Sequence, residues 1–296
     1  MLKNLKRSGR VKMKNKRLLK RRLSSAKNIH KITKTMEMVA ASKMRKAQEL
    51  AVSGKNYAEM IYEMASDLAD IDREGAHKFL KKYEKVDKAL VIVVSTNKGL
   101  CGGLNVNLFR FLTGWMSELK VDFEFINIGK KSQGFLRKYN DNFLADFSDE
   151  ERWINTTGAI MDLATKKFLE NEVQQVWICY SQFVSALKYE PGVIKLLPIE
   201  KLEGRDDENK FENYIIEPSI KEVLANLLPH YLEMQLKRAI YEAEASEHSA
   251  RMMAMKSASD NAMGLMDGIR HEYNKARQQS ITEELADITT ALMAIK

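Results

Sequence analysis

The stretch Ala245–Met266, which reads ASEHSARMMAMKSASDNAMGLM, decides how the rest of the chain is organised. It is rich in Ala, Ser and Met, contains no proline, and lies inside a longer segment, 218–296, that has helical periodicity. Small or apolar residues recur there in steps of three, four or seven, which marks one face of a helix. A helix of this length extends over roughly 115 Å. We therefore expect a long rod whose small-residue face needs a partner, as in a coiled coil.

A second periodic segment, near the start of the chain, has the matching character. Residues 18–53 contain no glycine or proline, and Gly54 interrupts a pattern that then resumes to about Ile71. Alanine, methionine and leucine recur every three or four residues, whereas lysine and arginine occupy the other faces. Two seams of small residues let helical backbones approach closely. The two segments are therefore predicted to pair as antiparallel helices.

Between the two helical segments the composition becomes that of a globular domain. VDKALVIVVST, from Val86, is an apolar and β-branched run typical of a buried strand, and VDFEFINIG and QQVWICYSQFV predict two more strands. Helices are expected between them, including one over 149–172 with Ser148 or Asp149 near its N-cap. Pro191-Gly192 predicts the turn of a hairpin. Alternating strands and helices favour an α/β sheet.

These patterns together predict an α/β protein, in which a long antiparallel coiled coil of N- and C-terminal helices accompanies a central Rossmann-like α/β domain. The predicted parts are a basic N-terminal extension over 1–17, a coiled-coil helix over 18–75, the α/β domain over 85–210 and a second coiled-coil helix over 214–296. A polar, acidic segment, 203–210, marks the return from the domain to the second helix.

The net charge is +8, and the positive excess is concentrated at the start of the chain. Fourteen Lys and Arg residues precede Glu37, whereas no acidic residue does. Such a block suits nucleic acid, an anionic membrane surface or an acidic protein. For 1–17 a solvated tail is the favoured interpretation, with a transit peptide or a true start at Met13 as alternatives.

Membrane spans, disulfides and metal sites are not expected. The sequence contains no run of about eighteen apolar residues, the minimum for a transmembrane helix. Cys101 and Cys179 are its two cysteines. Neither has the spacing of a metal ligand, and both are expected to stay reduced.

The segment Lys98–Asn105, KGLCGGLN, is the main candidate for chemistry. Its glycines follow a predicted strand and precede a predicted helix, which is where phosphate-binding loops lie. The spacing fits neither GxxxxGK[ST] nor GxGxxG, since Lys98 precedes the glycines and Leu104 follows them. A tight strand-to-helix turn is the favoured interpretation, and nucleotide binding is the alternative. No His lies near Cys101 in the sequence, so a nucleophilic cysteine is not supported.

The end of the chain forms an apolar tip. Leu285, Ile288, Leu292, Met293 and Ile295 are apolar within a dozen residues of the terminus. A terminus this apolar is expected to be covered by something. A surrounding protein is the favoured cover, and the chain's own N-terminal helix is the alternative.

Three segments together resemble the gamma subunit of the F-type ATP synthase, the central stalk of its F1 sector. They are NIHKITKTMEMVAASKMRKAQ from Asn28, KGLCGGLN from Lys98, and ASEHSARMMAMKSASDNA followed by YNKARQQSITEEL. Their order and spacing agree with that family from roughly Leu18 to Leu285. The resemblance implies a rotor rather than an enzyme: nucleotides and magnesium lie on neighbouring subunits, so no cofactor, metal or catalytic residue is expected in this chain.

The resemblance also implies partners and a location. The rod is expected to stand inside a ring of three alpha and three beta subunits, with the α/β domain near the epsilon subunit and the c-subunit ring. Proton flow through the c ring turns the rod, which drives ATP synthesis on the beta subunits. Such a protein is peripheral to the cytoplasmic face of the bacterial plasma (inner) membrane, or, as the alternative, to the matrix side of the mitochondrial inner membrane. Neither nucleic acid nor a small-molecule substrate of its own is expected.

Individual contact positions follow from the family's motifs. Lys34 and Met36 match positions that face an acidic beta-subunit loop. Tyr214 and Glu217, in YIIEP, match the foot that touches the c ring. The other implied beta-subunit contacts are polar, namely Arg251, Arg277, Gln278, Thr282 and Glu284.

The chain departs from the family pattern in several places. Residues 1–17 extend beyond the usual bacterial start, and Ser95–Lys98 stands where an Asp and a basic residue are usual. The end reads DITTALMAI where glycine-containing small residues are common, and the cysteine-bearing insert of chloroplast forms is absent. From the residues alone, two other functions stay open: a stand-alone α/β nucleotide-binding protein with helical arms, and a basic coiled-coil scaffold for nucleic acid.

Overall fold

The structure, a computed structural model, describes residues 2–71, 78–81, 83, 85–139, 143–150, 152–199 and 217–293. In the first helix, side chains are described from Lys16 onward, with gaps after Ser53. The chain divides into two compact units. The first, which we name the terminal helix pair, comprises 1–39 and 252–296, and the second, the α/β unit, comprises 40–251.

Two long helices, α1 (Leu2–Ile71) and α5 (Ile220–Met293), each contribute to both units. Ser219 caps the start of α5, because its Oγ accepts a hydrogen bond from the Glu222 backbone N–H at 3.3 Å. Gly54 lies inside α1 without ending it, since one glycine costs a helix interior only about 1 kcal/mol. The prediction of two long helices is confirmed.

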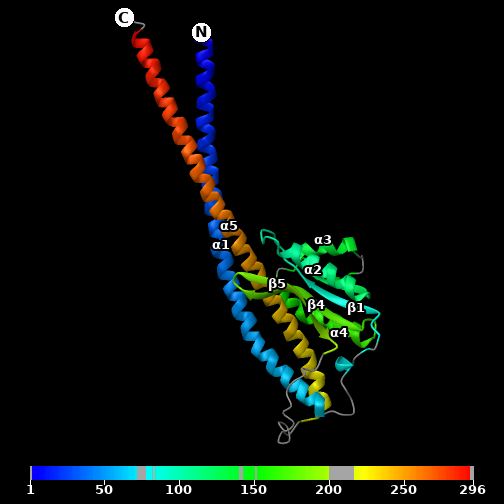
Figure 1. The fold of residues 1–296 in the computed structure, drawn as a ribbon. Coiled ribbons are helices and arrows are strands. Elements are labelled where there is room, and N and C mark those ends of the chain that lie inside the picture. The colour runs from blue at the N-terminus through cyan, green and yellow to red at the C-terminus, as the bar shows by residue number, and fades with distance from the viewer. Residues whose placement is uncertain are drawn as a thin grey trace. The chain divides into compact units, whose positions relative to one another are not determined.

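In the terminal helix pair, α1 and α5 run antiparallel (Figure 1). They join through mostly small side chains. The buried residues of this seam are Ala26 and Thr33 of α1 and Met255, Ser259, Ala262 and Ile269 of α5. A polar contact joins the helices too, since His30 Nδ1 lies 3.1 Å from both the backbone oxygen and Oγ of Ser259. Small side chains allow this close approach of two helical backbones.

The α/β unit is built on a five-stranded sheet in the order β3-β2-β1-β4-β5 (Figure 1). Its strands are β1 (Lys88–Val94), β2 (Asp122–Ile128), β3 (Phe143–Asp146), β4 (Gln175–Ser185) and β5 (Lys188–Leu197). The first four are parallel, and β5 pairs antiparallel with β4. In the central strand, Val91 lies opposite Phe125 of β2 and Trp177 of β4. This is the order of a Rossmann-type sheet, as predicted.

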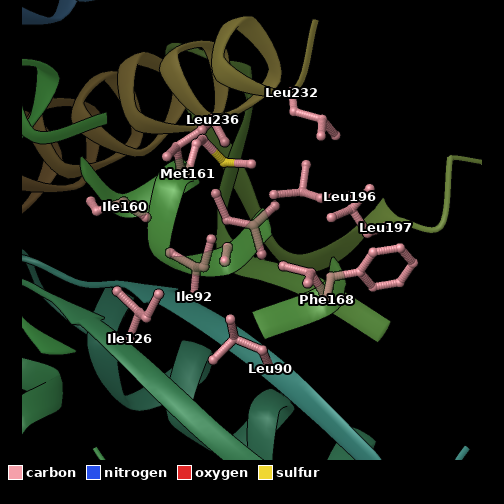
Figure 2. Close-up of a cluster of buried hydrophobic side chains, with 14 of the residues drawn as sticks. Leu90, Ile92, Ile126, Ile160, Met161, Phe168, Leu196, Leu197, Leu232 and Leu236 are labelled. Carbon is pink, nitrogen blue, oxygen red and sulfur yellow. The ribbon is translucent and has the colours of Figure 1, made fainter. Parts of the chain in front are cut away.

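Helices cover both faces of the sheet, and each face has its own apolar core. The covering helices are α2 (Leu104–Leu119), α3 (Lys130–Tyr139), α4 (Thr157–Leu169) and α5. Leu90 and Ile92 of β1 belong to the core that α4 and α5 cover, where Figure 2 shows Leu232 and Leu236 of α5. Val91 points to the opposite face, where α2 and α3 pack. The apolar run of β1 is thus explained by burial on both sides.

The β4–β5 hairpin differs from the prediction, which placed its turn at Pro191-Gly192. The strands turn at Ala186-Leu187 instead, and Pro191 and Gly192 lie within β5. A proline is tolerated there because β5 is an edge strand of the sheet, where a ladder hydrogen bond can be absent. A Cβ at position 192 would lie 2.7 Å from the side-chain nitrogen of Gln182, which explains why a glycine follows Pro191.

Two other local predictions are wrong. In place of one helix over 149–172, the structure has a 3₁₀ turn, η2 (Trp153–Thr156), followed by α4. The residue before α4 is therefore Thr156 rather than Ser148 or Asp149. Trp153 is only 5% exposed, so η2 serves to insert this ring into the core before the helix begins. Strand β3 was not expected, because its four residues are too few to show a periodic pattern.

Candidate functional site

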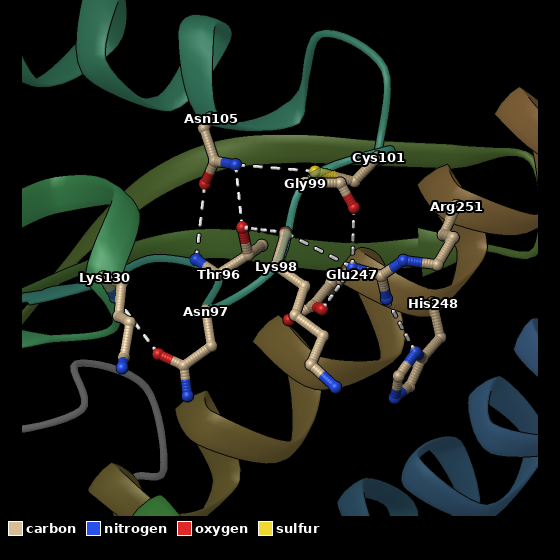
Figure 3. A network of polar contacts seen from close by, with 10 residues as sticks. All are labelled: Thr96, Asn97, Lys98, Gly99, Cys101, Asn105, Lys130, Glu247, His248 and Arg251. Carbon is tan, nitrogen blue, oxygen red and sulfur yellow. Dashed lines mark hydrogen bonds and ion pairs between the residues drawn. The ribbon is translucent and has the colours of Figure 1, made fainter. Parts of the chain in front are cut away.

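The glycine loop, Lys98–Asn105, joins β1 to α2 as a tight turn. Thr96 Oγ1 donates a hydrogen bond to the Lys98 backbone oxygen at 2.8 Å. Asn105 closes the loop from the helix side, since its Nδ2 donates to Thr96 Oγ1 at 2.8 Å and its Oδ1 accepts from the Thr96 N–H at 3.3 Å. Gly102 has a φ of +57°, a conformation that favours glycine. Figure 3 shows this network of side chains that holds the turn.

Arg251 of α5 binds the glycine loop from the opposite side. Its Nη2 donates to the backbone oxygens of Gly99 at 3.2 Å and Lys98 at 3.4 Å. The same nitrogen forms an ion pair with Glu247 Oε1 at 2.6 Å, one helical turn earlier on α5. Both side chains are only 12% exposed. Because Nη2 has two hydrogens for these three acceptors, at least one hydrogen is shared, and the charge-assisted bond to Glu247 is the shortest of the three.

Burial shifts the pKa values of the carboxylates and the imidazole around Arg251. Burial raises the pKa of Glu247, against the opposing effect of Arg251. Burial also raises the pKa of Glu244, with a further contribution from Glu247. The pKa of His248 falls to about 4, mainly through burial and then through Arg251 and Lys43. Because Arg251 Nη1 can only donate to His248 Nδ1, at 3.2 Å, the neutral ring carries its proton on Nε2.

The glycine loop lies where the strand order of the sheet reverses, between β1 and β4. Open α/β sheets bind ligands in the crevice at this point, beyond the carboxyl ends of the strands. Here α5 takes that place: Ala250 packs with Cys101 and Leu104, and Arg251 engages the loop carbonyls. Carbonyls held by a guanidinium do not present the N–H groups that a phosphate needs. The geometry therefore favours a structural turn over nucleotide binding.

The cysteines lack the setting of reactive thiols. Cys101 is 3% exposed, and its Sγ accepts a hydrogen bond from Asn105 Nδ2 at 3.4 Å. Burial raises the pKa of Cys179 to about 12, so this thiol stays protonated. Among the described residues, no group of three or more His, Cys, Asp and Glu side chains is arranged to hold a metal. Within the same residues, no helix has the length and apolarity needed to cross a membrane.

The structure places the predicted contact residues in both units. Lys34 and Met36 lie on α1 in the terminal helix pair, where Lys34 is half exposed and pairs with Glu37 at 3.0 Å and Met36 is partly buried. Four exposed residues of the same unit lie on α5, namely Arg277, Gln278, Thr282 and Glu284. Arg251 belongs to the α/β unit and is engaged there. Glu217 is exposed just before α5, and Tyr214 lies outside the described residues.

Sequence reasoning missed a row of polar residues that fixes α5 to the α/β unit. Glu233 accepts a hydrogen bond from Thr157 Oγ1 at 3.3 Å, and Glu242 accepts one from the Tyr180 hydroxyl at 3.0 Å. Ser249 Oγ donates to the Ala186 backbone oxygen at 2.7 Å, in the β4–β5 turn. The signal available in the sequence was that glutamates recur within an Ala- and Ser-rich stretch of the helix. Glutamates that only face solvent would be expected on the other side of the helix.

Comparison with known proteins assigns the family. A family model described as ATP synthase matches residues 15–295. An ATP synthase gamma chain of Dehalococcoides mccartyi is 40% identical over 291 residues, which cover 96% of this chain and 100% of the relative. The chain belongs to the ATP synthase gamma-chain family. A further gamma chain, from Glaesserella parasuis, is 40% identical over 287 residues, covering 94% of this chain and 98% of that relative.

Solved structures show that this gamma-chain family member has the fold of known stalk proteins. A chain from the Euglena gracilis mitochondrial ATP synthase (OSCP/F1/c-ring, rotational state 3) matches with a TM-score of 0.63 and 22% identity, covering 95% of this chain and 94% of that one. A chain from the Tetrahymena thermophila mitochondrial ATP synthase (central stalk/c-ring) matches with a TM-score of 0.58 and 22% identity, covering 77% and 99%. The predicted fold class is confirmed.

Proposed function

We propose that this member of the gamma-chain family is the central-stalk rotor subunit of an F1Fo ATP synthase. It mechanically couples proton translocation through the c ring to ATP synthesis on the beta subunits, and it catalyses no reaction itself. The observation that carries the proposal is 40% identity to a bacterial gamma chain over 96% of this chain. Identity over the whole length means that both long helices and the α/β unit share in the likeness.

The terminal helix pair has the surface that a rotating shaft needs. Its seam is closed by small residues, whereas every described side chain of α5 from 281 to 293 is exposed. Apolar residues are prominent in that stretch, with Leu285 at 59%, Leu292 at 63% and Met293 at 79% exposure. An apolar surface this exposed indicates a protein partner. We assign the cover to a ring of three alpha and three beta subunits.

The contacts that turn beta subunits through their states are assigned to a few positions, all of them polar except Met36. On α1 they are Lys34 and Met36, and on α5 they are the four exposed residues Arg277, Gln278, Thr282 and Glu284. Sparse polar contacts on a mostly smooth rod suit rotation, because a tight site would trap the shaft at one angle. Arg251 is proposed as a further beta-subunit contact, and its guanidinium is also bound within the α/β unit.

The contact with the c ring is assigned to the segment before α5. Glu217 is exposed there, and together with Tyr214, which lies outside the described residues, it is proposed to form the foot that touches the c ring. The epsilon subunit is the further partner proposed for the α/β unit. Because the curated relatives above are bacterial, we place the complex at the cytoplasmic face of the plasma membrane, with this chain as a peripheral component.

Reconstituted rotation tests this function. The chain is combined with alpha and beta subunits of a related bacterial synthase, and ATP-driven turning of a probe on the α/β unit is recorded. The complete mixture is expected to rotate in one direction, whereas the chain alone hydrolyses no ATP. A complex that assembles and hydrolyses ATP without turning the probe would overturn the proposal.

A matched pair of variants sharpens the test. Gln278 and Gln279 are both exposed on α5 and point to different sides of the helix, since adjacent residues do not share a face. Gln278→Ala is expected to slow rotation of the assembled complex, and Gln279→Ala is the control. Equal effects of the two substitutions would argue against a specific beta contact at Gln278.

A further inference from the structure

α5 meets the rest of the α/β unit through two different kinds of surface. Along Leu224–Ala243 its leucines, among them Leu232 and Leu236, pack into the core shared with α4 and one face of the sheet. After Ala243 the inward residues become small: Ala245, Ser246, Ser249 and Ala250. These side chains bury little apolar area, so polar contacts must fix the position of the helix there.

Those polar contacts reach two different strand ends. Ser249 Oγ binds the Ala186 oxygen in the turn after β4. Arg251 binds the Lys98 and Gly99 oxygens in the loop after β1. β1 is the middle strand of the sheet and β4 is its neighbour. The helix is therefore held at two points along one edge of the sheet.

The two surfaces respond differently to a twisting force. Apolar burial is non-directional, so it opposes loss of the leucine face from the core without fixing a precise angle of the helix. Hydrogen bonds weaken steeply when their angle departs from linearity. A rotation of α5 about its own axis therefore strains its directional contacts, which are those of Glu233 and Glu242 along the leucine stretch and those of Ser249 and Arg251 beyond it.

Glu247 makes the Arg251 contact directional. Its Oε1 holds Nη2 of Arg251 at 2.6 Å, and that nitrogen also faces the two loop oxygens. Since Glu247 and Arg251 are both 12% exposed, solvent screens the pair weakly. A lysine at 251 would retain the charge but not the planar two-nitrogen group, in which Nη2 faces Glu247 and the loop while Nη1 donates to His248 Nδ1.

We propose that Glu247 and Arg251 form a clamp that locks the glycine loop, and with it the sheet, to α5. Torque then passes between the sheet and α5 without slip. The clamp rests on the proposed rotor function. Arg251 and Glu247 are positioning residues in this scheme: they set torsional stiffness and touch neither nucleotide nor ion.

The test compares three variants of the full chain in the reconstituted complex. Arg251→Lys and Glu247→Gln each weaken the clamp conservatively, and Arg270→Ala is the control, since Arg270 is 63% exposed and pairs with Asp267 on its own helix. A probe is attached through Val106→Cys, because Val106 is 59% exposed on α2 whereas Cys101 and Cys179 are buried. The measured quantities are ATP hydrolysis, protons pumped per ATP, and the angular variance of the probe during catalytic pauses.

Hydrogen exchange on the same full chains reports whether the clamp exists. Losing a charge-assisted hydrogen bond should speed exchange of the glycine-loop amides by about tenfold in Arg251→Lys. In the complex, Glu247→Gln is expected to keep the hydrolysis rate of assembled enzyme while angular variance rises and pumped protons per ATP fall, with Arg270→Ala like wild type. Arg251→Lys is judged by loop exchange, because Arg251 is also a proposed beta-subunit contact.

Two results would overturn the clamp. Unchanged loop exchange would show that the contact does not hold the loop. Faster exchange with unchanged angular variance and coupling would show a contact that only supports the fold. Failure of the wild-type complex to rotate would instead overturn the proposed rotor function, and the exchange result would still decide whether Arg251 holds the loop.

Discussion

Replacing Gly129 with alanine is expected to destabilise the α/β unit, because the turn after β2 has no room for a side chain. Gly129 has a φ of +96°. A Cβ there would lie 2.2 Å from the Ser95 backbone oxygen. The Ser95 N–H donates to the Ile128 oxygen at 2.9 Å, and its Oγ lies 2.6 Å from Ser132 Oγ. The added methyl group would therefore push apart the ends of two paired strands and disturb a buried polar network.

The expected magnitude follows from two contributions. A side chain in this region of backbone space costs roughly 1–3 kcal/mol. Overpacking at a buried contact costs typically 1–3 kcal/mol more, so Gly129→Ala should lower the free energy of unfolding by about 2–6 kcal/mol. Gly114→Ala is the matched control. Gly114 lies exposed inside α2 with nothing within 4 Å of its Cβ position, so the substitution should raise stability by about 0.5–1 kcal/mol.

Urea unfolding followed by tryptophan fluorescence measures both variants. The three tryptophans are Trp115, Trp153 and Trp177, and all lie in the α/β unit, so the signal reports this unit. The midpoint should fall for Gly129→Ala and rise slightly for Gly114→Ala. A midpoint for Gly129→Ala within error of wild type would refute the close approach between the ends of β1 and β2.

Two further predictions use the same assay. Leu236→Ala empties a fully buried position in the core that α4 and α5 share, and should lower the free energy of unfolding by about 2–5 kcal/mol. Leu187→Ala, at a site 72% exposed, should change it by less than about 0.5 kcal/mol. Similar losses of stability in the two variants would contradict the assigned core. Because burial lowers the pKa of His248 from 6.5 to about 4, its stabilising contribution is present above pH 6.5 and lost as the pH falls towards 4. His248→Gln should therefore lose less stability than wild type between pH 7 and pH 5, and identical pH profiles would count against a buried neutral imidazole.

The main elements of the fold were predictable because their patterns are local. The small-residue periodicity of the two long helices predicts which of their faces is buried. The apolar run of β1 likewise predicts a strand buried on both sides. The hairpin turn was misplaced because Pro191-Gly192 is a strong turn signal, and only the edge position of β5 and the Gln182 side chain explain its place in a strand. Strand β3 was missed because its four residues are too few to show a periodic pattern.

The candidate site was less predictable, because its contacts join distant parts of the chain. Arg251 binds Gly99, which lies 152 residues earlier, and no periodicity encodes such a pairing. On a helix, Glu247 and Arg251 read as an ordinary i,i+4 ion pair on a surface. The family resemblance assigned Arg251 to a beta-subunit contact, which stays a prediction, and within the chain the structure shows its guanidinium bound to Glu247 and to the glycine loop.

The covering of the sheet by α5 has a consequence for biosynthesis. One face of β1, with Leu90 and Ile92, is completed only by leucines between 224 and 236, more than 130 residues later in the chain. During synthesis that face stays without its last layer until α5 has left the ribosome, and exposed apolar surface of this kind favours aggregation. A fragment that ends before α5 would keep the same defect permanently. The sheet that α5 holds for torque is thus also a sheet whose folding must wait for that helix.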